Sequence, residues 1–174
     1  KAVGRLTEWV DVTYPGGEWM IDGWAFANRQ FWQPFRVKRV LEAIPPALDL
    51  IVWAYPAEDQ PTYELFDYWQ PASWALIVFH SSGGNTSVHG DVHRIMGRTY
   101  RALCDQRADK LVGYGLYTEA NDYTPFFKDL VLRMAWDPFI TPELFIRDYC
   151  ERRYAAGSVD SMVRVHELLL QTVY

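Results

Sequence analysis

The chain has 174 residues, of which 49% are hydrophobic and 22% are charged, so it is long and apolar enough to fold as one ordinary domain. Its net charge of −5 argues against a nucleic-acid partner, because proteins that bind the phosphate backbone gather Lys and Arg on one surface. The sequence contains no run of about 18 apolar residues, which argues against a membrane-spanning helix.

Both ends of the chain suggest a piece of a longer protein. The first residue is Lys1, and no apolar run typical of a signal peptide follows it. The last positions, 168–174, continue an amphipathic helical pattern up to the final residue. We therefore expect that further segments of the same protein complete the fold.

Four apolar segments of strand length alternate with segments of helical periodicity in the first three quarters of the chain. We expect strands at 18–26, 48–54, 74–80 and 111–119. We expect helices at 34–44, over a stretch that ends near Cys104, and at 124–136, with a long connection at 55–70. Strands that alternate with helices form parallel sheets, because each helix returns the chain to the start of the next strand.

The alternation stops after Asp137-Pro138, where two helices are expected, at 142–154 and 158–174, without a strand between them. We therefore place a domain boundary near Trp136. Residues 1–136 are predicted to form a partial (β/α) barrel catalytic domain, and residues 137–174 the beginning of an α-helical domain. Four βα units cannot close an eight-stranded barrel, so the expected fold is α/β, half of a (β/α)8 TIM-like barrel followed by the start of an all-α domain.

Polar or aromatic residues follow each expected strand: Trp24 the first, residues 57–61 the second, residues 80–85 the third and Glu119 the fourth. Barrel enzymes place their active sites at the carboxyl ends of the strands, so we expect these residues to converge. Glycoside hydrolysis requires two carboxylates, and Glu119, which has Tyr residues on both sides, is the first candidate. The alternative is an ordinary glutamate that caps the following helix.

Other motifs give weaker signals. The Gly83-Gly-Asn85 turn lacks the Lys-Ser/Thr that completes a phosphate loop. His89 and His93 have helical i, i+4 spacing but lack the His-Glu-x-x-His pattern of zinc hydrolases. His80 is either a hydrogen-bond donor to a substrate or a structural histidine with satisfied partners. The sequence predicts no metal and no cofactor.

Several of these segments resemble a known family when they are taken together. The segments are Trp19-Met-Ile-Asp-Gly-Trp-Ala-Phe, Gln30-Phe-Trp, Ala57-Glu-Asp-Gln-Pro-Thr-Tyr, His80-Ser-Ser-Gly-Gly-Asn and Gly115-Leu-Tyr-Thr-Glu. Their order and approximate spacing are similar to those of the α-N-acetylglucosaminidases, the glycoside hydrolase family of the lysosomal heparan-degrading enzyme and its bacterial relatives. The resemblance runs from about Glu18 to the end of the chain.

The resemblance implies the C-terminal half of the catalytic barrel of a retaining exo-α-glycosidase that removes terminal α-linked N-acetylglucosamine from glycans. It makes Glu119 the catalytic nucleophile. It suggests that Trp24 stacks on the sugar ring, that His80 and Asn85 donate hydrogen bonds to it, and that Glu58 orients one of them. The implied partners are the glycan substrate and the remainder of the barrel, with no cofactor, no nucleic acid and no membrane span. A secreted, periplasmic or lysosomal location would follow.

The family's general acid lies in an Asn-Glu motif upstream of the first of these strands, and this chain contains no Asn-Glu. We therefore expect the acid in a preceding segment and the isolated chain to be inactive. Asp22 stands where the family has Gln, Ala54 where it usually has Asp, and Ser81 and Ser82 where it has Asn and Phe. The exact sugar therefore stays open. The alternative function is a non-catalytic carbohydrate-binding or structural module, and a zinc hydrolase is more distant.

Overall fold

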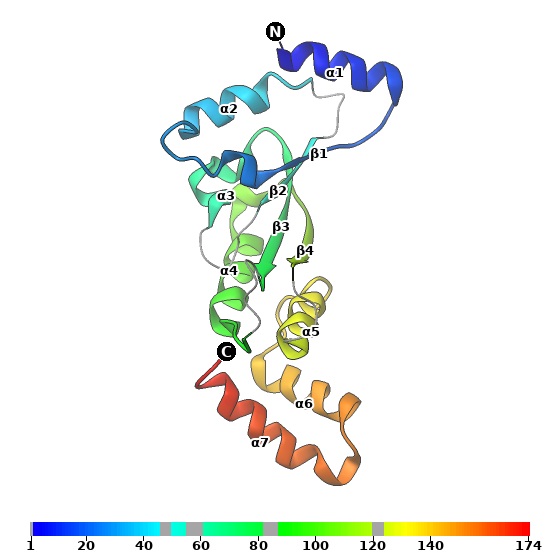
Figure 1. Cartoon of the computed structure of the whole chain (residues 1–174), viewed down its shortest axis with the longest axis vertical. Coiled ribbons are helices and arrows are strands. Elements are labelled where there is room, and N and C mark those ends of the chain that lie inside the picture. The colour runs from blue at the N-terminus through cyan, green and yellow to red at the C-terminus, as the bar shows by residue number, and fades with distance from the viewer. Residues whose placement is uncertain (1, 46–49, 55–60, 82–86, 120–123) are drawn as a thin grey trace. The chain divides into compact units, whose positions relative to one another are not determined.

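A computed structural model describes residues 2–45, 50–54, 61–81, 87–119 and 124–174 (Figure 1). The strands of the described part are β1 (Trp19–Asp22), β2 (Leu50–Ala54), β3 (Ser73–His80) and β4 (Leu111–Thr118). The α-helices there are α1 (Ala2–Thr13), α2 (Pro34–Glu42), α3 (Thr62–Leu65), α4 (Val92–Cys104), α5 (Pro125–Met134), α6 (Pro142–Arg153) and α7 (Val159–Leu170). None of these helices has the length and apolar character that a membrane crossing needs.

The strands form one sheet in the order β1-β2-β3-β4. β1 pairs with β2 in parallel, with Trp19 opposite Leu50, and β2 pairs with β3 in parallel, with Ile51 opposite Ser73. A helix lies between successive strands along the chain, as parallel connections require. The α/β class and the parallel sheet are therefore confirmed, and the architecture is that of a partial barrel.

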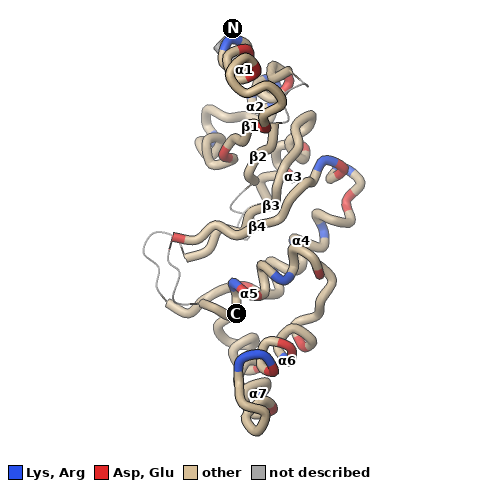
Figure 2. Tube along the Cα trace, turned by 90° about the vertical axis from the view of Figure 1, so that its right-hand side faces the viewer, with Lys and Arg blue, Asp and Glu red and all other residues tan. Residues whose placement is uncertain are grey.

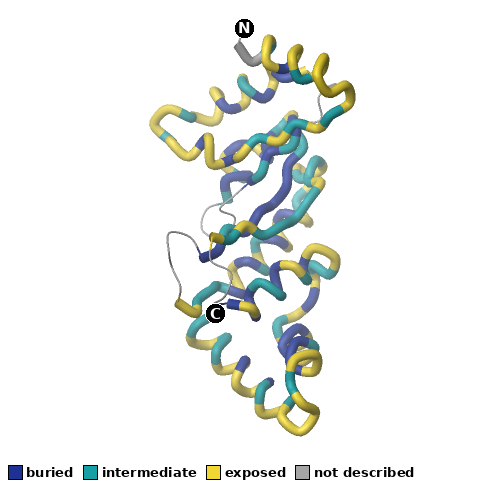
Figure 3. The backbone as a smooth tube through the Cα atoms, turned by 45° about the vertical axis from the view of Figure 1, so that its right-hand side comes forward, coloured by how far each residue is buried: buried dark blue, intermediate teal, exposed yellow. Residues whose placement is uncertain are grey.

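β3 is the most deeply buried strand of the described sheet (Figure 3). Trp74, Leu76 and Val78, which alternate along it, are fully buried. A strand with neighbours on both sides and cover on its faces becomes a nearly continuous apolar run in the sequence, which explains why the pattern predicted this one well. β1 and β4 form the two edges of the described sheet, and Met20 and Val112 on them are exposed.

The chain divides into two compact units. The first unit, residues 1–77 and 102–114, has an aromatic core in which Trp69 packs against Phe26 and Phe66, with ring centroids 5.8 and 4.8 Å away. In the same core, Tyr63 stacks on Trp74 with centroids 5.1 Å apart. Both of these tryptophans are fully buried, so they contribute to packing and are not accessible to a sugar.

The connection expected at 55–70 contains secondary structure that the sequence did not predict. α3 is followed by a single turn, Asp67–Trp69, whose three residues have φ angles of 52°, 53° and 59°. Each non-glycine residue in this left-handed region costs about 1–2 kcal/mol. Tyr68 and Trp69 are both fully buried, and burial of their rings offsets that cost.

The second unit comprises residues 78–101 and 115–174. Its centre is aromatic as well: His166 of α7 stacks on Phe126 of α5 at 4.7 Å and meets Tyr149 of α6 edge-on at 5.2 Å. Charges of both signs line α6 (Figure 2), and Arg147 pairs with Asp160 of α7 at 3.3 Å. The two helices expected after residue 138 are confirmed, whereas the domain boundary near Trp136 stays a prediction.

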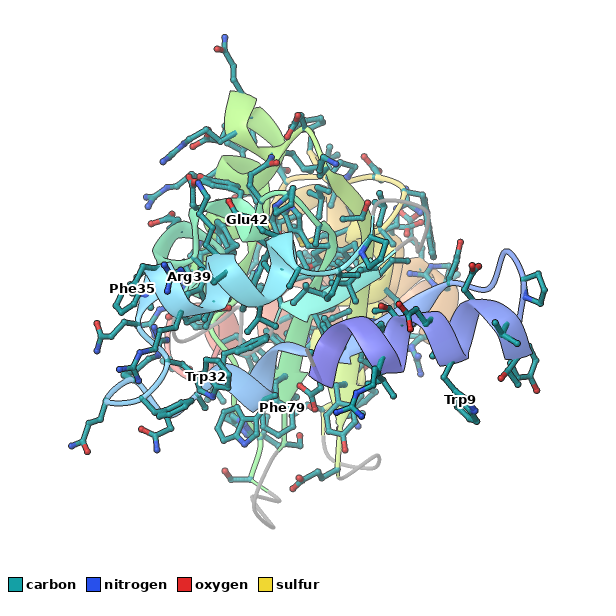
Figure 4. The ribbon with its side chains drawn as sticks, turned by 90° about the horizontal axis from the view of Figure 1, so that it is seen from above. Trp9, Trp32, Phe35, Arg39, Glu42 and Phe79 are labelled. Atoms are coloured by element: carbon teal, nitrogen blue, oxygen red, sulfur yellow. The ribbon has the colours of Figure 1, made fainter. Side chains whose placement is uncertain are left out.

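Two elements near the N-terminus differ from the expectation. The expected strand 18–26 ends at Asp22, because a 3-10 helix occupies Gly23–Phe26. α1 was not expected at all: it has no acidic residue in its first turn and no basic residue in its last, so the usual end signals are missing. Trp9 projects from α1 and is 65% exposed (Figure 4).

Candidate active site

Glu119 is the first residue after β4, at a bend where the strand stops, and it is exposed. Two positions earlier, the ring of Tyr117 packs against Phe79 of β3 with centroids 5.3 Å apart; Phe79 is labelled in Figure 4. Successive side chains of a strand point to opposite faces, so Tyr117 and Phe79 share one face of the sheet.

His80 ends β3, next to Phe79 in the sequence, and therefore lies on the opposite face. It is only 4% exposed. Its imidazole packs against Phe127 of α5 and against His89, each with centroids 4.3 Å away. His80 thus occupies a buried position beside α5, whereas the face of Tyr117 and Phe79 is on the other side of the strand.

The imidazole of His80 is hydrogen-bonded and neutral. Its Nε2 atom lies 2.8 Å from the hydroxyl of Thr124, and both groups are buried. The pKa of His80 is lowered to about 4, mainly by burial and secondarily by electrostatic repulsion from the nearby His89 and Lys128. The ring is therefore uncharged at neutral pH. One nitrogen is satisfied, as in a structural histidine, and the predicted role as a donor to substrate rests on the other nitrogen, Nδ1.

Trp24 lies in the first unit, in a short 3-10 helix whose N-terminus is capped by the side chain of Asp22. β1 stops at Asp22, whose side-chain Oδ1 accepts a hydrogen bond of 2.7 Å from the backbone N–H of Trp24. This bond caps the 3-10 helix that follows and leaves Trp24 54% exposed. An exposed indole just past a strand end has room to stack on a sugar ring, and this role of Trp24 stays a prediction.

The other predicted substrate-binding residues, Glu58 and Asn85, lie outside the described residues, as does the Gly83-Gly84 turn. The structure brings His80 and Glu119 to the ends of two neighbouring strands, β3 and β4, within the second unit. Trp24 belongs to the first unit, whereas His80 and Glu119 belong to the second.

Two residues beside the predicted ones have structural features that the sequence analysis did not predict. Ser81 follows His80 with φ of 58°, is 2% exposed, and has a buried hydroxyl without a hydrogen-bond partner among the described residues. Thr124 is fully buried and bonds His80. The sequence held a signal for Thr124, because a Thr-Pro pair opens a helix both there and at Thr141-Pro142.

The two histidines considered for zinc belong to different surroundings. Nδ1 of His89 lies 2.8 Å from the backbone carbonyl of Ser87, so this nitrogen carries a proton and donates. His93 is an exposed residue of α4. Within the described residues, no three His, Cys, Asp or Glu side chains are grouped as a metal site would require.

Comparison with known proteins gives one family and one curated relative. The profile of the family described as Alpha-N-acetylglucosaminidase (NAGLU) tim-barrel domain matches residues 4–138. The human protein named Alpha-N-acetylglucosaminidase is 27% identical over 159 residues. That alignment covers 90% of this chain but 21% of the human protein, so the chain spans about a fifth of the length of that relative.

Proposed function

We propose, since the chain belongs to the family of Alpha-N-acetylglucosaminidase tim-barrel domains, that this protein is part of a retaining glycosidase that releases terminal α-linked N-acetylglucosamine. Glu119 is its nucleophile. The observation that supports this assignment is the exposed position of Glu119 directly after β4, two residues beyond Tyr117. Barrel enzymes place their catalytic groups at this end of the strands, and a carboxylate there can reach a bound sugar.

Retention divides the reaction into two steps. In the first, the carboxylate of Glu119 attacks the anomeric carbon while a carboxylic acid about 5–5.5 Å away protonates the departing oxygen. This forms a covalent glycosyl-enzyme intermediate. In the second step the same acid, now ionised, takes a proton from water, and the water displaces Glu119 from the anomeric carbon.

The general acid belongs to another segment of the barrel in this proposal. The 174 residues contain no Asn-Glu, the motif in which the resemblance places that acid. Without a proton donor the leaving oxygen departs as an unstable anion, so the chain on its own should hydrolyse unactivated glycosides very slowly. An aryl glycoside with a good leaving group depends less on the acid and should lose less rate.

Trp24 is proposed to hold the sugar ring, because its indole is exposed at the end of β1 and pyranose C–H groups pack well on an aromatic face. Glu58 and Asn85 keep the roles that the resemblance gives them. A module that binds sugar without catalysis would use the same tryptophan, and only turnover distinguishes the two functions.

The test uses the full-length protein and an aryl α-N-acetylglucosaminide. Glu119→Gln should lower kcat by at least about 1,000-fold, whereas Glu42→Gln, at an exposed glutamate that ends α2 (Figure 4), should leave it unchanged. NMR of the first product should show the α anomer. A β product would exclude retention, and sugar binding by a wild-type protein without turnover would favour the non-catalytic module.

A further inference from the structure

The segment Gln30-Phe-Trp, which contributes to the family resemblance, has no role in the proposed site. It lies in the connection between β1 and α2, residues 23–33, all of which the structure describes. In a (β/α) barrel, the connection from a strand to the next helix lies at the carboxyl end of that strand, where substrates bind. Trp24, the proposed sugar-stacking residue, stands near the start of the same connection.

The two aromatic residues of this segment have different surroundings. Trp32 packs edge-on against the buried ring of Phe26, with centroids 5.1 Å apart, and so joins the core of the first unit. Phe31 is 53% exposed, nearly as much as Trp24. An exposed phenylalanine forgoes part of the stabilisation that burial of its ring would give, so its packing alone does not account for an aromatic residue at this position.

Phe31 is exposed but held in place by its neighbours. Its ring meets Trp32 edge-on at 4.8 Å, and the guanidinium of Arg36 lies over it, 5.0 Å from the centroid. Its backbone is fixed as well, because Nη1 of Arg36 donates a hydrogen bond of 2.9 Å to the carbonyl of Phe31. The N–H of Phe31 is 3.2 Å from the backbone oxygen of Asn28. A ligand that packs on a ring already fixed in this way avoids the entropic cost of ordering it.

We propose that Phe31 contacts the second sugar of the glycan, the sugar that departs with the cleaved oxygen. This inference rests on the proposed function. Trp24 stands just past the end of β1, whereas Phe31 stands in the turn farther along the connection to α2. An enzyme that removes a terminal sugar holds that sugar at the strand ends, so the next sugar lies farther out, among the connections. The outer aromatic residue therefore fits the second sugar.

The chemistry of the surroundings suits a pyranose. The C–H groups of a sugar ring pack on an aromatic face, and its hydroxyl groups surround the edge. Arg36 is exposed beside Phe31 and uses one of its N–H groups for the carbonyl of that residue. Its other N–H groups can donate to hydroxyl oxygens of a sugar that packs on Phe31.

Calorimetric titration of the full-length protein with two ligands tests the proposal, in a Glu119→Gln background that keeps the ligands intact. Methyl α-N-acetylglucosaminide occupies the terminal-sugar position alone, whereas N-acetylglucosamine α-linked to methyl glucoside occupies both positions. Phe31→Ala should raise the Kd of the disaccharide about tenfold and leave that of the methyl glycoside within about twofold. Phe31→Trp, which keeps an aromatic face, should stay within about twofold of the parent protein for both ligands.

Phe139→Ala is the matched control. Phe139 is 59% exposed and meets Tyr100 edge-on at 5.5 Å, so it resembles Phe31 in exposure and in ring contact. It follows α5 and not a strand, and therefore lies away from the carboxyl ends of the strands. Its substitution should change neither Kd.

An unchanged Kd of the disaccharide in Phe31→Ala, or equal losses for both ligands, would overturn the proposal. Equal losses are the expected result if another part of the protein covers the ring. If Phe31→Ala does not fold, Phe31→Leu keeps apolar bulk without an aromatic face and should show the same selective loss. A wild-type protein that binds the disaccharide without cleaving it would reject the proposed glycosidase alone, because the two Kd values would still decide the role of Phe31.

Discussion

The carbonyl oxygen of Trp53 on β2 lies only 2.4 Å from the place where a Cβ atom on Gly23 would be. Gly23 directly follows β1, so the backbone of the first turn past that strand presses against the neighbouring strand. Only glycine permits this approach without a shift of one backbone or the other. The exposed position of Trp24, the next residue, depends on it.

Gly23→Ala should therefore destabilise the protein by about 1–3 kcal/mol, because the added methyl group meets backbone and not a flexible side chain. Gly97→Ala is the matched control. Gly97 lies inside α4 with nothing within 4 Å of its Cβ position, so alanine should stabilise the protein by about 0.5–1 kcal/mol. Urea unfolding of the two variants should give shifts of opposite sign, and equal shifts would contradict the structure.

Trp24→Ala should raise KM about tenfold and leave the free energy of unfolding nearly unchanged, since the indole is 54% exposed and stacking acts on ground and transition states alike. Trp9→Ala, at a more exposed tryptophan on α1, should change neither quantity appreciably. Steady-state kinetics with a series of substrate concentrations decides the matter, and an unchanged KM in Trp24→Ala would remove this residue from the site.

Ser81→Gly should stabilise the protein by about 1 kcal/mol. Glycine adopts a φ of 58° without the strain that a side chain carries there, and the substitution also removes a buried hydroxyl that has no partner in the described part of the chain. Ser81→Val should destabilise it, because a β-branched residue tolerates this backbone poorly. Thermal unfolding should show a higher Tm than wild type for Ser81→Gly and a lower Tm for Ser81→Val.

The strands and most helices were predictable because burial leaves a strong periodic pattern. The face of His80 was predictable too, because every second side chain of a strand points to the same face. His80 therefore lies on the face of Trp74, Leu76 and Val78, and all of these residues are buried. Three features escaped the sequence analysis. α1 has no end signals, the left-handed turn before β3 depends on tertiary burial of its rings, and the partner of Thr124 is distant in the sequence.

The protein should lose stability as the pH falls from about 6.5 to about 4. The folded state holds the pKa of His80 at about 4, below its ordinary value of 6.5. Between these two pH values, His80 is protonated in the unfolded chain but stays neutral in the folded chain, so protonation favours unfolding. The shift corresponds to up to about 3 kcal/mol, which is fully lost below pH 4. Burial lowers the pKa of His166 as well, with the same sign.

Urea unfolding at about pH 7.5 and about pH 4.5 tests this dependence, with His80→Gln as the comparison. The variant should show a smaller difference between the two pH values than the wild type. Equal differences would mean that His80 is not buried in its neutral form.

Trapping the covalent intermediate tests most directly whether Glu119 is the attacking carboxylate. The full-length protein would be treated with a mechanism-based 2-deoxy-2-fluoro glycosyl donor, digested, and the labelled peptide sequenced by mass spectrometry. We expect one sugar per protein, attached to Glu119 and absent in Glu119→Gln. A label on any other carboxylate would contradict the proposed mechanism.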